Sequence, residues 1–136
     1  MVSVAILSLM SKRKAIKLMD ELAHKCIQLT EPIHVIAIVT GGRVVGKNIV
    51  RYLRSKGKQV DYFEVQINVT KGKASIWKTD FKKKNYTGTA LLAEDVVWQG
   101  KSLKAAKRML RNMSRKKFYT AVLLDFNKLA DFSIFS

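Results

Sequence analysis

The stretch from Ala90 to Leu103 combines residue types that suit a phosphorylated sugar. It reads ALLAEDVVWQGKSL, in which a run of small and apolar residues ends in the adjacent acids Glu94 and Asp95. A short loop then leads to Gly100-Lys101-Ser102, where a helix is expected to begin. Carboxylates accept hydrogen bonds from sugar hydroxyls, whereas loop amides and a helix N-terminus bind phosphate. The order strand, acid pair, loop and helix therefore predicts a site for a ligand that carries both groups.

A second glycine-containing loop follows another strongly apolar segment. His34 to Val39 (HVIAIV) is typical of a buried parallel strand, and it leads into Thr40-Gly41-Gly42-Arg43. Open parallel sheets bind ligands at the carboxyl ends of their strands. Because both loops follow strands, they are expected to line one crevice. The two glycines would let backbone amides approach an anion, and the arginine would add a positive charge.

The rest of the chain supplies the elements of an α/β domain. Apolar residues at helical spacing predict helices over residues 12–29, 44–56 and 102–117. β-Branched or alternating segments predict strands over residues 34–39, 59–69, 73–78, 89–93 and 118–124. Strands that alternate with helices at this spacing imply right-handed crossovers. We therefore predict one domain, residues 1–136, built as a three-layer, mostly parallel twisted sheet with flanking helices.

The charge of the chain indicates an anionic partner. Lys and Arg number 26 against 10 Asp and Glu, which gives a net charge of +16 at pH 7. Cys26 is the only cysteine, so neither an intrachain disulfide nor a cysteine-based metal site is expected. No apolar run approaches the roughly 20 residues that span a bilayer, and the opening residues lack the features of a secretion signal. We expect a cytoplasmic protein that does not bind membranes.

Gly41 to Lys47 also fits a competing motif. GGRVVGK matches G-x-x-x-x-G-K, the phosphate-binding loop of nucleotide hydrolases, and Glu94-Asp95 would then hold the metal. The next residue is Asn48, whereas that loop requires a Ser or Thr hydroxyl to bind magnesium. This alternative also leaves the loop at Gly100 without a role, so we do not favour it.

The order of the parts resembles the type I phosphoribosyltransferases over roughly residues 12 to 124. The family signature is an apolar strand, two acids, two apolar residues, and a Thr-Gly loop followed by Ser or Thr. Residues 91–102 of this chain read LLAEDVVWQGKS. The likeness implies that Glu94 and Asp95 are the catalytic acids and bind the ribose of phosphoribosyl pyrophosphate. It also implies that the following loop binds the 5-phosphate through Val97, Trp98, Gln99, Gly100, Lys101 and Ser102.

The same resemblance implies a reaction. The 5-phosphoribosyl group would pass from phosphoribosyl pyrophosphate to a nucleobase, with a purine-like base favoured and the xanthine-guanine branch most similar. Mg²⁺ would be held through phosphoribosyl pyrophosphate and not by direct protein ligands, and a homodimer is expected. The loop after the first strand would bind pyrophosphate through Thr40, Gly41, Gly42 and Arg43. Residues 68–87 fall where the family carries a flexible loop, whose basic residues would shield the leaving group: Lys71, Lys73, Lys82, Lys83 and Lys84.

Two positions depart from the family pattern. Trp98 stands where purine-type members often carry an Asp near the base, and Gln99 stands at the Thr position. Trp98 cannot accept a proton, but it offers a surface on which a base could stack. The C-terminal tail resembles a reduced form of the family's aromatic hood, with Phe132 as a second base contact. The alternative is that the tail packs on the core or on a second subunit through its aromatic residues: Phe126, Phe132 and Phe135.

A basic segment supports a second hypothesis from another class. Lys101 to Lys117 contains eight Lys or Arg and no acid, and a stripe forms at helical spacing from Lys104, Arg108, Arg111 and Arg115. Clustered basic side chains bind the backbone of a nucleic acid without reading its bases. The alternative function is a catalytically degenerate regulator with the phosphoribosyltransferase fold that binds nucleic acid through this helix. The plain alternative is a solvated basic surface.

Overall fold

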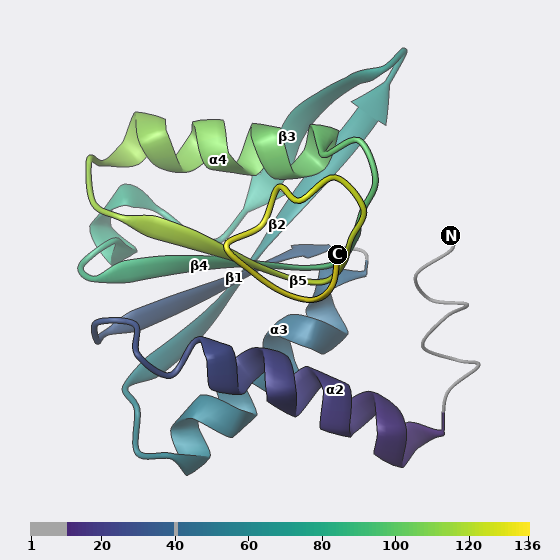
Figure 1. The fold of residues 1–136 in the computed structure, drawn as a ribbon. Coiled ribbons are helices and arrows are strands. Elements are labelled where there is room, and N and C mark those ends of the chain that lie inside the picture. Colours follow the sequence, from purple (N-terminus) through teal and green to yellow (C-terminus); the bar gives the residue numbers. More distant parts are fainter. Residues whose placement is uncertain (1–10, 40) are drawn as a thin grey trace.

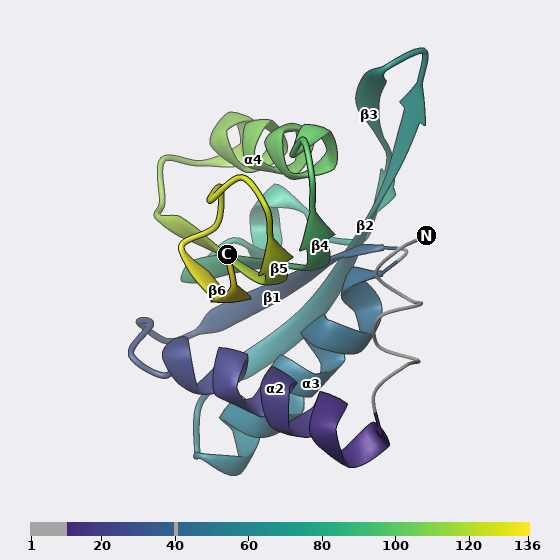
Figure 2. The same cartoon turned by 45° about the vertical axis from the view of Figure 1, so that its right-hand side comes forward.

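The computed structural model describes residues 11–39 and 41–136. Six strands form one twisted sheet, and helices cover both of its faces (Figures 1 and 2). α2 (Lys12–Lys25) and α3 (Gly42–Ser55) pack on one face, whereas α4 (Lys101–Met113) packs on the other. The predicted three-layer α/β architecture is confirmed. Within these residues, no helix has the length and apolar character needed to cross a bilayer.

The sheet is parallel apart from one hairpin. Its strands lie in the order β3-β2-β1-β4-β5-β6, and β3 pairs antiparallel with β2 whereas the other neighbouring pairs are parallel. β1 therefore has β2 on one edge and β4 on the other, so the chain reverses its direction of winding between β1 and β4. Open α/β sheets bind ligands at such a reversal. The strand bounds are β1 Ile33–Val39, β2 Val60–Thr70, β3 Lys73–Thr79, β4 Thr89–Val97, β5 Phe118–Asp125 and β6 Phe132–Phe135.

Two apolar cores hold the layers together. All seven residues of β1 are buried, as the continuous apolar run predicts for a strand covered on both faces. On one face, α3 buries the stripe Val45, Ile49 and Leu53 against the sheet. On the other, α4 buries Leu103, Ala106 and Leu110. Because each helix is apolar on one side only, its opposite side faces solvent with its charged residues.

The observed elements differ from the predicted ones chiefly at their ends. β4 continues beyond Ala93 to Val97, because the segment that contains the acid pair still pairs with β5. α4 ends at Met113, where Ser114 adopts an extended backbone, so the last basic residues lie outside the helix. β6 was not predicted, because four residues are too few to show a period; it adds a parallel edge strand beside β5.

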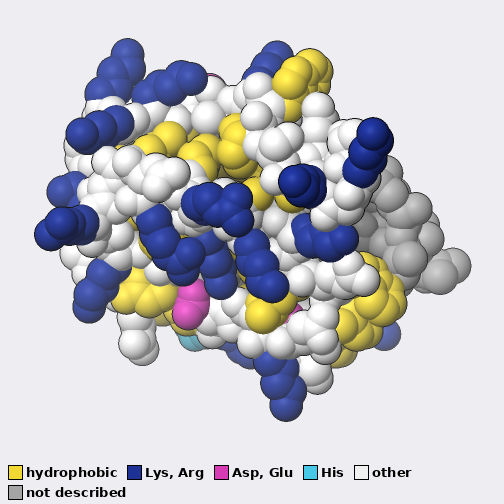
Figure 3. All heavy atoms as spheres, turned by 90° about the horizontal axis from the view of Figure 1, so that it is seen from above, with side chains coloured by type: hydrophobic (Ala, Val, Ile, Leu, Met, Phe, Trp, Pro, Cys, Tyr) yellow, Lys and Arg dark blue, Asp and Glu magenta, His cyan; other side chains and the backbone are white. Residues whose placement is uncertain are grey.

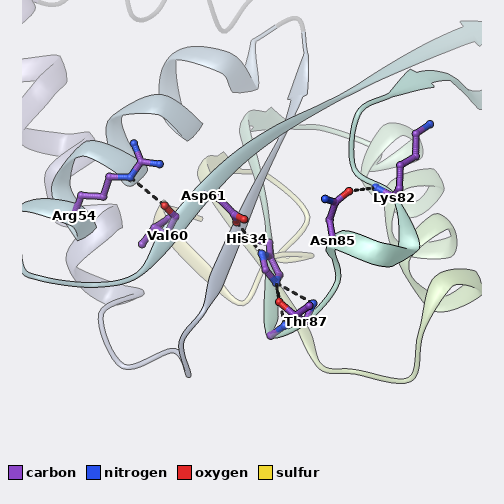
Figure 4. A network of polar contacts seen from close by, with 8 residues as sticks. His34, Arg54, Val60, Asp61, Lys82, Asn85 and Thr87 are labelled. Carbon is purple, nitrogen blue, oxygen red and sulfur yellow. Dashed lines mark hydrogen bonds and ion pairs between the residues drawn. The ribbon is translucent and has the colours of Figure 1, made fainter.

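A polar clamp fixes the amino ends of the central strands (Figure 4). His34 is buried, and its Nδ1 lies 2.7 Å from Asp61 Oδ1. Its Nε2 accepts hydrogen bonds from the backbone N–H groups of Thr87, at 3.2 Å, and Gly88, at 2.9 Å. Because Nε2 accepts both bonds, the ring proton is on Nδ1, which donates to Asp61. The clamp ties the segment before β4 to β1, at the end of the sheet opposite the two glycine loops.

Candidate functional site

The loops that follow β1 and β4 meet at the carboxyl edge of the sheet. The two strands are paired neighbours, with Ala37 opposite Ala93 near that edge. Gly41 lies directly against the carboxylate of Asp95, and Gly42 lies against the carbonyl of Ala93, so neither position has room for a Cβ. The structure therefore brings together the two loops that the sequence predicted to share one crevice.

A pocket of about 680 Å³ opens beside this junction. Its volume lies within the range of small-molecule sites. It contains most of the residues predicted to bind the ribose and its phosphate: Glu94, Val97, Trp98, Gln99, Gly100, Lys101 and Ser102. The remaining lining residues are Val69, Val96, Leu103, Phe126 and Asn127. Val69 and Asn127 carry no motif in the sequence, and only the tertiary fold places them here.

The start of α4 has the form of an anion site. Gly100 has a φ of 78° and a ψ of 18°, a left-handed conformation, and a Cβ at this position would collide with the Leu129 side chain. α4 begins at Lys101 with no side chain that caps its first N–H groups and no acid in its first turn. These N–H groups, the helix dipole and the ammonium of Lys101 all favour a bound anion such as phosphate.

The two acids have different surroundings. Asp95 is buried; its Oδ1 accepts the Val96 N–H at 2.8 Å, and its Oδ2 has no hydrogen-bond partner. It faces Gly41 and is absent from the pocket lining, whereas Glu94 lines the pocket. Burial, together with the neighbouring Asp95 carboxylate, raises the pKa of Glu94 well above its usual range. A ligand with hydroxyl groups could donate a hydrogen bond to the unpaired Asp95 oxygen. A ligand that carries a cation would also reduce the repulsion between the two acids.

Arg43 is held away from the loop that it was predicted to serve. Its Nε donates to Glu64 Oε2 at 2.7 Å and its Nη2 donates to Oε1 at 3.0 Å, which forms a bidentate pair on β2. The hydroxyl of Tyr62 donates to the same carboxylate at 2.6 Å. The Arg43 guanidinium lowers the pKa of Glu64 below its ordinary value. In this structure the positive charge of Arg43 is neutralised by its ion pair with Glu64. Thr40, the first predicted pyrophosphate residue, lies outside the described residues.

The predicted flexible loop divides into two parts. Residues 60–79 form the β2–β3 hairpin, whose tip brings Gly72 beside the Lys101 side chain and Val69 into the pocket lining. Lys71 and Lys73 flank that tip, near the phosphate loop. Lys82–84 instead lie in the segment between β3 and β4, where Lys83 begins a short 3-10 helix. None of the three lines the pocket of the 94–103 loop, but Lys82 lines a second pocket together with Arg43 and Glu64.

Two aromatic rings stack at the pocket. The rings of Trp98 and Phe126 have centroids 4.2 Å apart and planes 14° apart, and each side chain is about half exposed. The side chain of Asn127 donates a hydrogen bond to the Trp98 carbonyl, which joins the tail to the loop after β4. Phe132, the second predicted base contact, does not join them. It lies on β6 near Tyr119 and packs on the core beneath α2, because pairing with Ala121 turns it to that face.

The comparisons with known proteins agree with this geometry. Residues 7–134 match the family described as the phosphoribosyl transferase domain. Since the match spans almost the whole chain, the protein belongs to this family and is a phosphoribosyltransferase, an enzyme of the glycosyltransferase class. The predicted resemblance to the type I members is confirmed. A comparison with curated proteins gave no match.

Solved structures with the same fold include three purine enzymes. A hypoxanthine-guanine phosphoribosyltransferase from Bacillus anthracis aligns with a TM-score of 0.75 and 22% identity, over 93% of this chain and 79% of that one. A purine phosphoribosyltransferase from Pyrococcus horikoshii aligns with a TM-score of 0.75 and 18% identity, over 93% and 84%. A hypoxanthine-guanine phosphoribosyltransferase from L. donovani aligns with a TM-score of 0.70 and 17% identity, over 89% of this chain and 74% of that one.

Proposed function

We propose that the protein transfers the 5-phosphoribosyl group from phosphoribosyl pyrophosphate to a purine-like nucleobase and releases pyrophosphate. The observation that carries the proposal is the junction of Gly41 with Asp95 beside the pocket of the 94–103 loop. In the reaction, the bond between the anomeric carbon and pyrophosphate breaks, and the leaving group keeps the electron pair. A base nitrogen forms the new bond to that carbon, and the proton it loses passes to solvent.

The roles of the chain follow from where each group lies. Glu94 and Asp95 accept hydrogen bonds from the ribose hydroxyls, which holds the sugar in position for the reaction. Gly41 and Gly42 offer backbone N–H groups to pyrophosphate. The 5-phosphate binds at the start of α4, through the loop from Val97 to Ser102. The protein mainly positions the reactants and stabilises charge. We assign Thr40 and Arg43 to pyrophosphate as well, with Arg43 released from Glu64 when the ligand arrives.

Magnesium fits this site as a companion of the substrate. Glu94 and Asp95 place carboxyl groups beside the pocket, and one Asp95 oxygen is buried without a partner. The described residues contain no group of three or more His, Cys, Asp or Glu arranged to hold a metal. Mg²⁺ would therefore be held by oxygens of phosphoribosyl pyrophosphate and not by direct protein ligands. When bound, Mg²⁺ would neutralise charge on the leaving pyrophosphate.

The stacked pair of Trp98 and Phe126 supports recognition of the base at the tail side of the pocket. A purine ring offers a large flat surface to such a pair, and the structural neighbours named above are purine enzymes. In this proposal Phe126 takes the place that the sequence suggested for Phe132. Trp98→Ala should raise the KM for the base about tenfold and leave the affinity for phosphoribosyl pyrophosphate unchanged, whereas Trp98→Phe should retain most base affinity.

We also propose a single catalytic domain over residues 1–136 that works as a homodimer in the cytoplasm. Two exposed apolar side chains, Trp77 and Val44, support contact between copies, and light scattering with size exclusion would measure the mass of the assembly.

Burial raises the pKa of the Cys26 thiol to about 12, which keeps it protonated and unreactive.

The catalytically degenerate alternative is not favoured, because the acid pair, the left-handed Gly100 and the pocket are all retained.

Calorimetric titration with phosphoribosyl pyrophosphate, with and without Mg²⁺, tests the proposal. We expect binding in the presence of Mg²⁺ and at least a tenfold loss of affinity in Asp95→Asn. Glu21→Gln, which removes an exposed charge on α2, is the control and should bind like the parent. A protein that binds should then be screened with nucleobases for release of pyrophosphate. Absence of binding in the parent protein would contradict the proposed reaction.

A further inference from the structure

The charges of this protein are distributed unevenly over the fold. Three acids form ion pairs, and their partners are Arg43, Arg51 and Lys58, while Asp61 accepts a hydrogen bond from His34. Three more accept backbone N–H groups, and Glu94 with Asp95 belong to the pocket. Among the described residues, no acid forms an ion pair with a residue of α4. The positive charge on the solvent side of α4 is therefore not paired with an acid in the part of the chain that the structure describes.

The exposed side of α4 carries a regular row of cations. Lys104, Arg108 and Arg111 are all exposed and follow one another at intervals of one helical turn. Like charges at this spacing repel each other. The opposite side of the helix is buried against the sheet, so these three side chains are not part of the apolar core; Arg111 lies over the Phe118 ring, with its guanidinium carbon 5.4 Å from the ring centroid.

A second basic segment lies beside this row, although it is distant in sequence. Lys82 and Arg108 line the same groove between β3 and α4. The hydroxyl of Tyr86 donates hydrogen bonds to the carbonyls of Lys116, at 3.1 Å, and Lys117, at 3.2 Å. The turn that holds the triple-lysine run is thus fixed next to the end of α4. We call the combined surface the α4 basic face: Lys82–Lys84, Lys104, Arg108, Arg111 and Arg115–Lys117.

Figure 3 views the molecule from the side of α4 and shows Lys and Arg side chains spread over this side, with few acids among them.

We propose that the α4 basic face binds the phosphate backbone of a double-stranded nucleic acid without reading its bases. A helix of 13 residues is about 20 Å long. A duplex carries one charge per about 1.7 Å of its axis with both strands counted, so a segment of this length carries about twelve phosphates, and those on one side of it can face α4.

The composition of the face favours a duplex over other polyanions. None of the large exposed apolar side chains of the described residues lies on α4; Trp77 lines a pocket with Lys82 at the edge of the face, and the others are Val44, Val69, Trp98, Phe126 and Phe135. Single-stranded nucleic acids need several aromatic rings on which successive bases stack, whereas α4 itself carries no aromatic side chain. Membrane-surface helices insert an apolar side into the lipid, whereas the apolar side of α4 is buried in the protein.

Fluorescence anisotropy with labelled 20-base-pair RNA and DNA duplexes tests this proposal. At 50–100 mM KCl we expect a Kd on the order of micromolar, with no preference among sequences. The triple variant Lys104→Gln, Arg108→Gln, Arg111→Gln should bind at least tenfold more weakly. The slope of log K against log salt should fall by about 2–3. A Lys82→Gln, Lys83→Gln, Lys84→Gln variant should also bind more weakly, because the structure places that turn on the same face.

The matched control removes three exposed charges from α2 on the opposite side of the sheet: Arg13→Gln, Lys14→Gln and Lys17→Gln. It should retain the parent's affinity. Equal weakening in the control and in the α4 variant would overturn the proposal, because binding would then depend only on net charge. Tighter binding to single strands, binding to anionic vesicles that a duplex does not displace, or no binding at 50 mM KCl would each overturn it as well. Lys101 is unchanged throughout, and melting temperatures would confirm that each variant folds.

Discussion

The carboxylate of Asp95 rests on the backbone of Gly41, so the acid at the end of β4 supports the loop that follows β1. Both residues were predicted to bind parts of one ligand, but the structure adds that they also contact each other. Any side chain at residue 41 would push on a buried carboxylate, and any change at residue 95 would remove a support of the loop. The two halves of the site are therefore expected to be energetically coupled.

Gly41→Ala should destabilise the protein by about 1–3 kcal/mol, because the added methyl group overlaps Asp95. In an Asp95→Ala background the carboxylate is gone, and the same substitution should cost less than about 0.5 kcal/mol. Urea unfolding of the parent, both single variants and the double variant measures this coupling. Additive costs in the double variant would show that the two residues do not interact as described.

Sequence reasoning could predict the order of strands and helices, because the apolar run of β1 and the stripes of α3 and α4 are local patterns. It also located the loop at Gly100, since a glycine before a helix with no acid in its first turn is visible in the sequence. The pairing of Arg43 with Glu64 was not predictable, because it joins a helix start to a strand 21 residues away through side-chain geometry.

The position of the lysine run could not be read from the sequence for a related reason. Lys82–84 lie in the segment between the β2–β3 hairpin and β4, where sequence position alone suggested a loop over the pocket. The hydrogen bonds of Thr87 and Gly88 to His34 fix the end of that segment to the amino ends of the strands, whereas Lys82, at its start, lines a pocket with Arg43. Phe132 was misplaced because its face depends on the pairing of β6 with β5, which four residues do not reveal.

Replacing Glu94 by Gln should stabilise the free protein at neutral pH. The pKa of Glu94 is raised in the folded state, so the folded protein binds more protons than the unfolded chain once the pH exceeds the ordinary value of 4.5. Stability is then lost as the pH rises toward the folded pKa. Glu94→Gln should remove this loss. A gain of about 1 kcal/mol in the free energy of unfolding would appear as a rise in Tm of about 3–6 °C. Thermal unfolding at pH 4 and pH 8 measures it. Glu21→Gln, on the surface of α2, should show no such gain; an equal Tm for Glu94→Gln and the parent at pH 8 would refute the assignment.

Releasing Arg43 should strengthen binding of the substrate. Glu64→Gln removes the negative charge that holds the guanidinium on β2, so Arg43 becomes available to the pyrophosphate of the ligand. We expect about 2–5-fold tighter binding of phosphoribosyl pyrophosphate, the range of an exposed ion pair. Arg43→Gln should instead weaken it. Tyr62→Phe keeps the ion pair and loses only one hydrogen bond, so it serves as the control. Calorimetry that finds weaker binding in Glu64→Gln would mean that Glu64 itself helps to hold the ligand.

Substitution of His34 should cost stability without a direct effect on the pocket. His34→Ala empties a buried site, removes the hydrogen bond to Asp61 and leaves the part-buried N–H groups of Thr87 and Gly88 without their acceptor, and we expect a loss of about 2–4 kcal/mol in the free energy of unfolding. Asp61→Asn should cost less, because Asp61 is half exposed and its amide oxygen can still accept from Nδ1. Below the temperature at which His34→Ala unfolds, its affinity for phosphoribosyl pyrophosphate should match the parent's, since the clamp lies at the opposite end of the sheet. Chemical unfolding and calorimetry measure the two quantities separately. A stable His34→Ala protein that has lost the ligand would show that the clamp positions the site and does more than hold the fold.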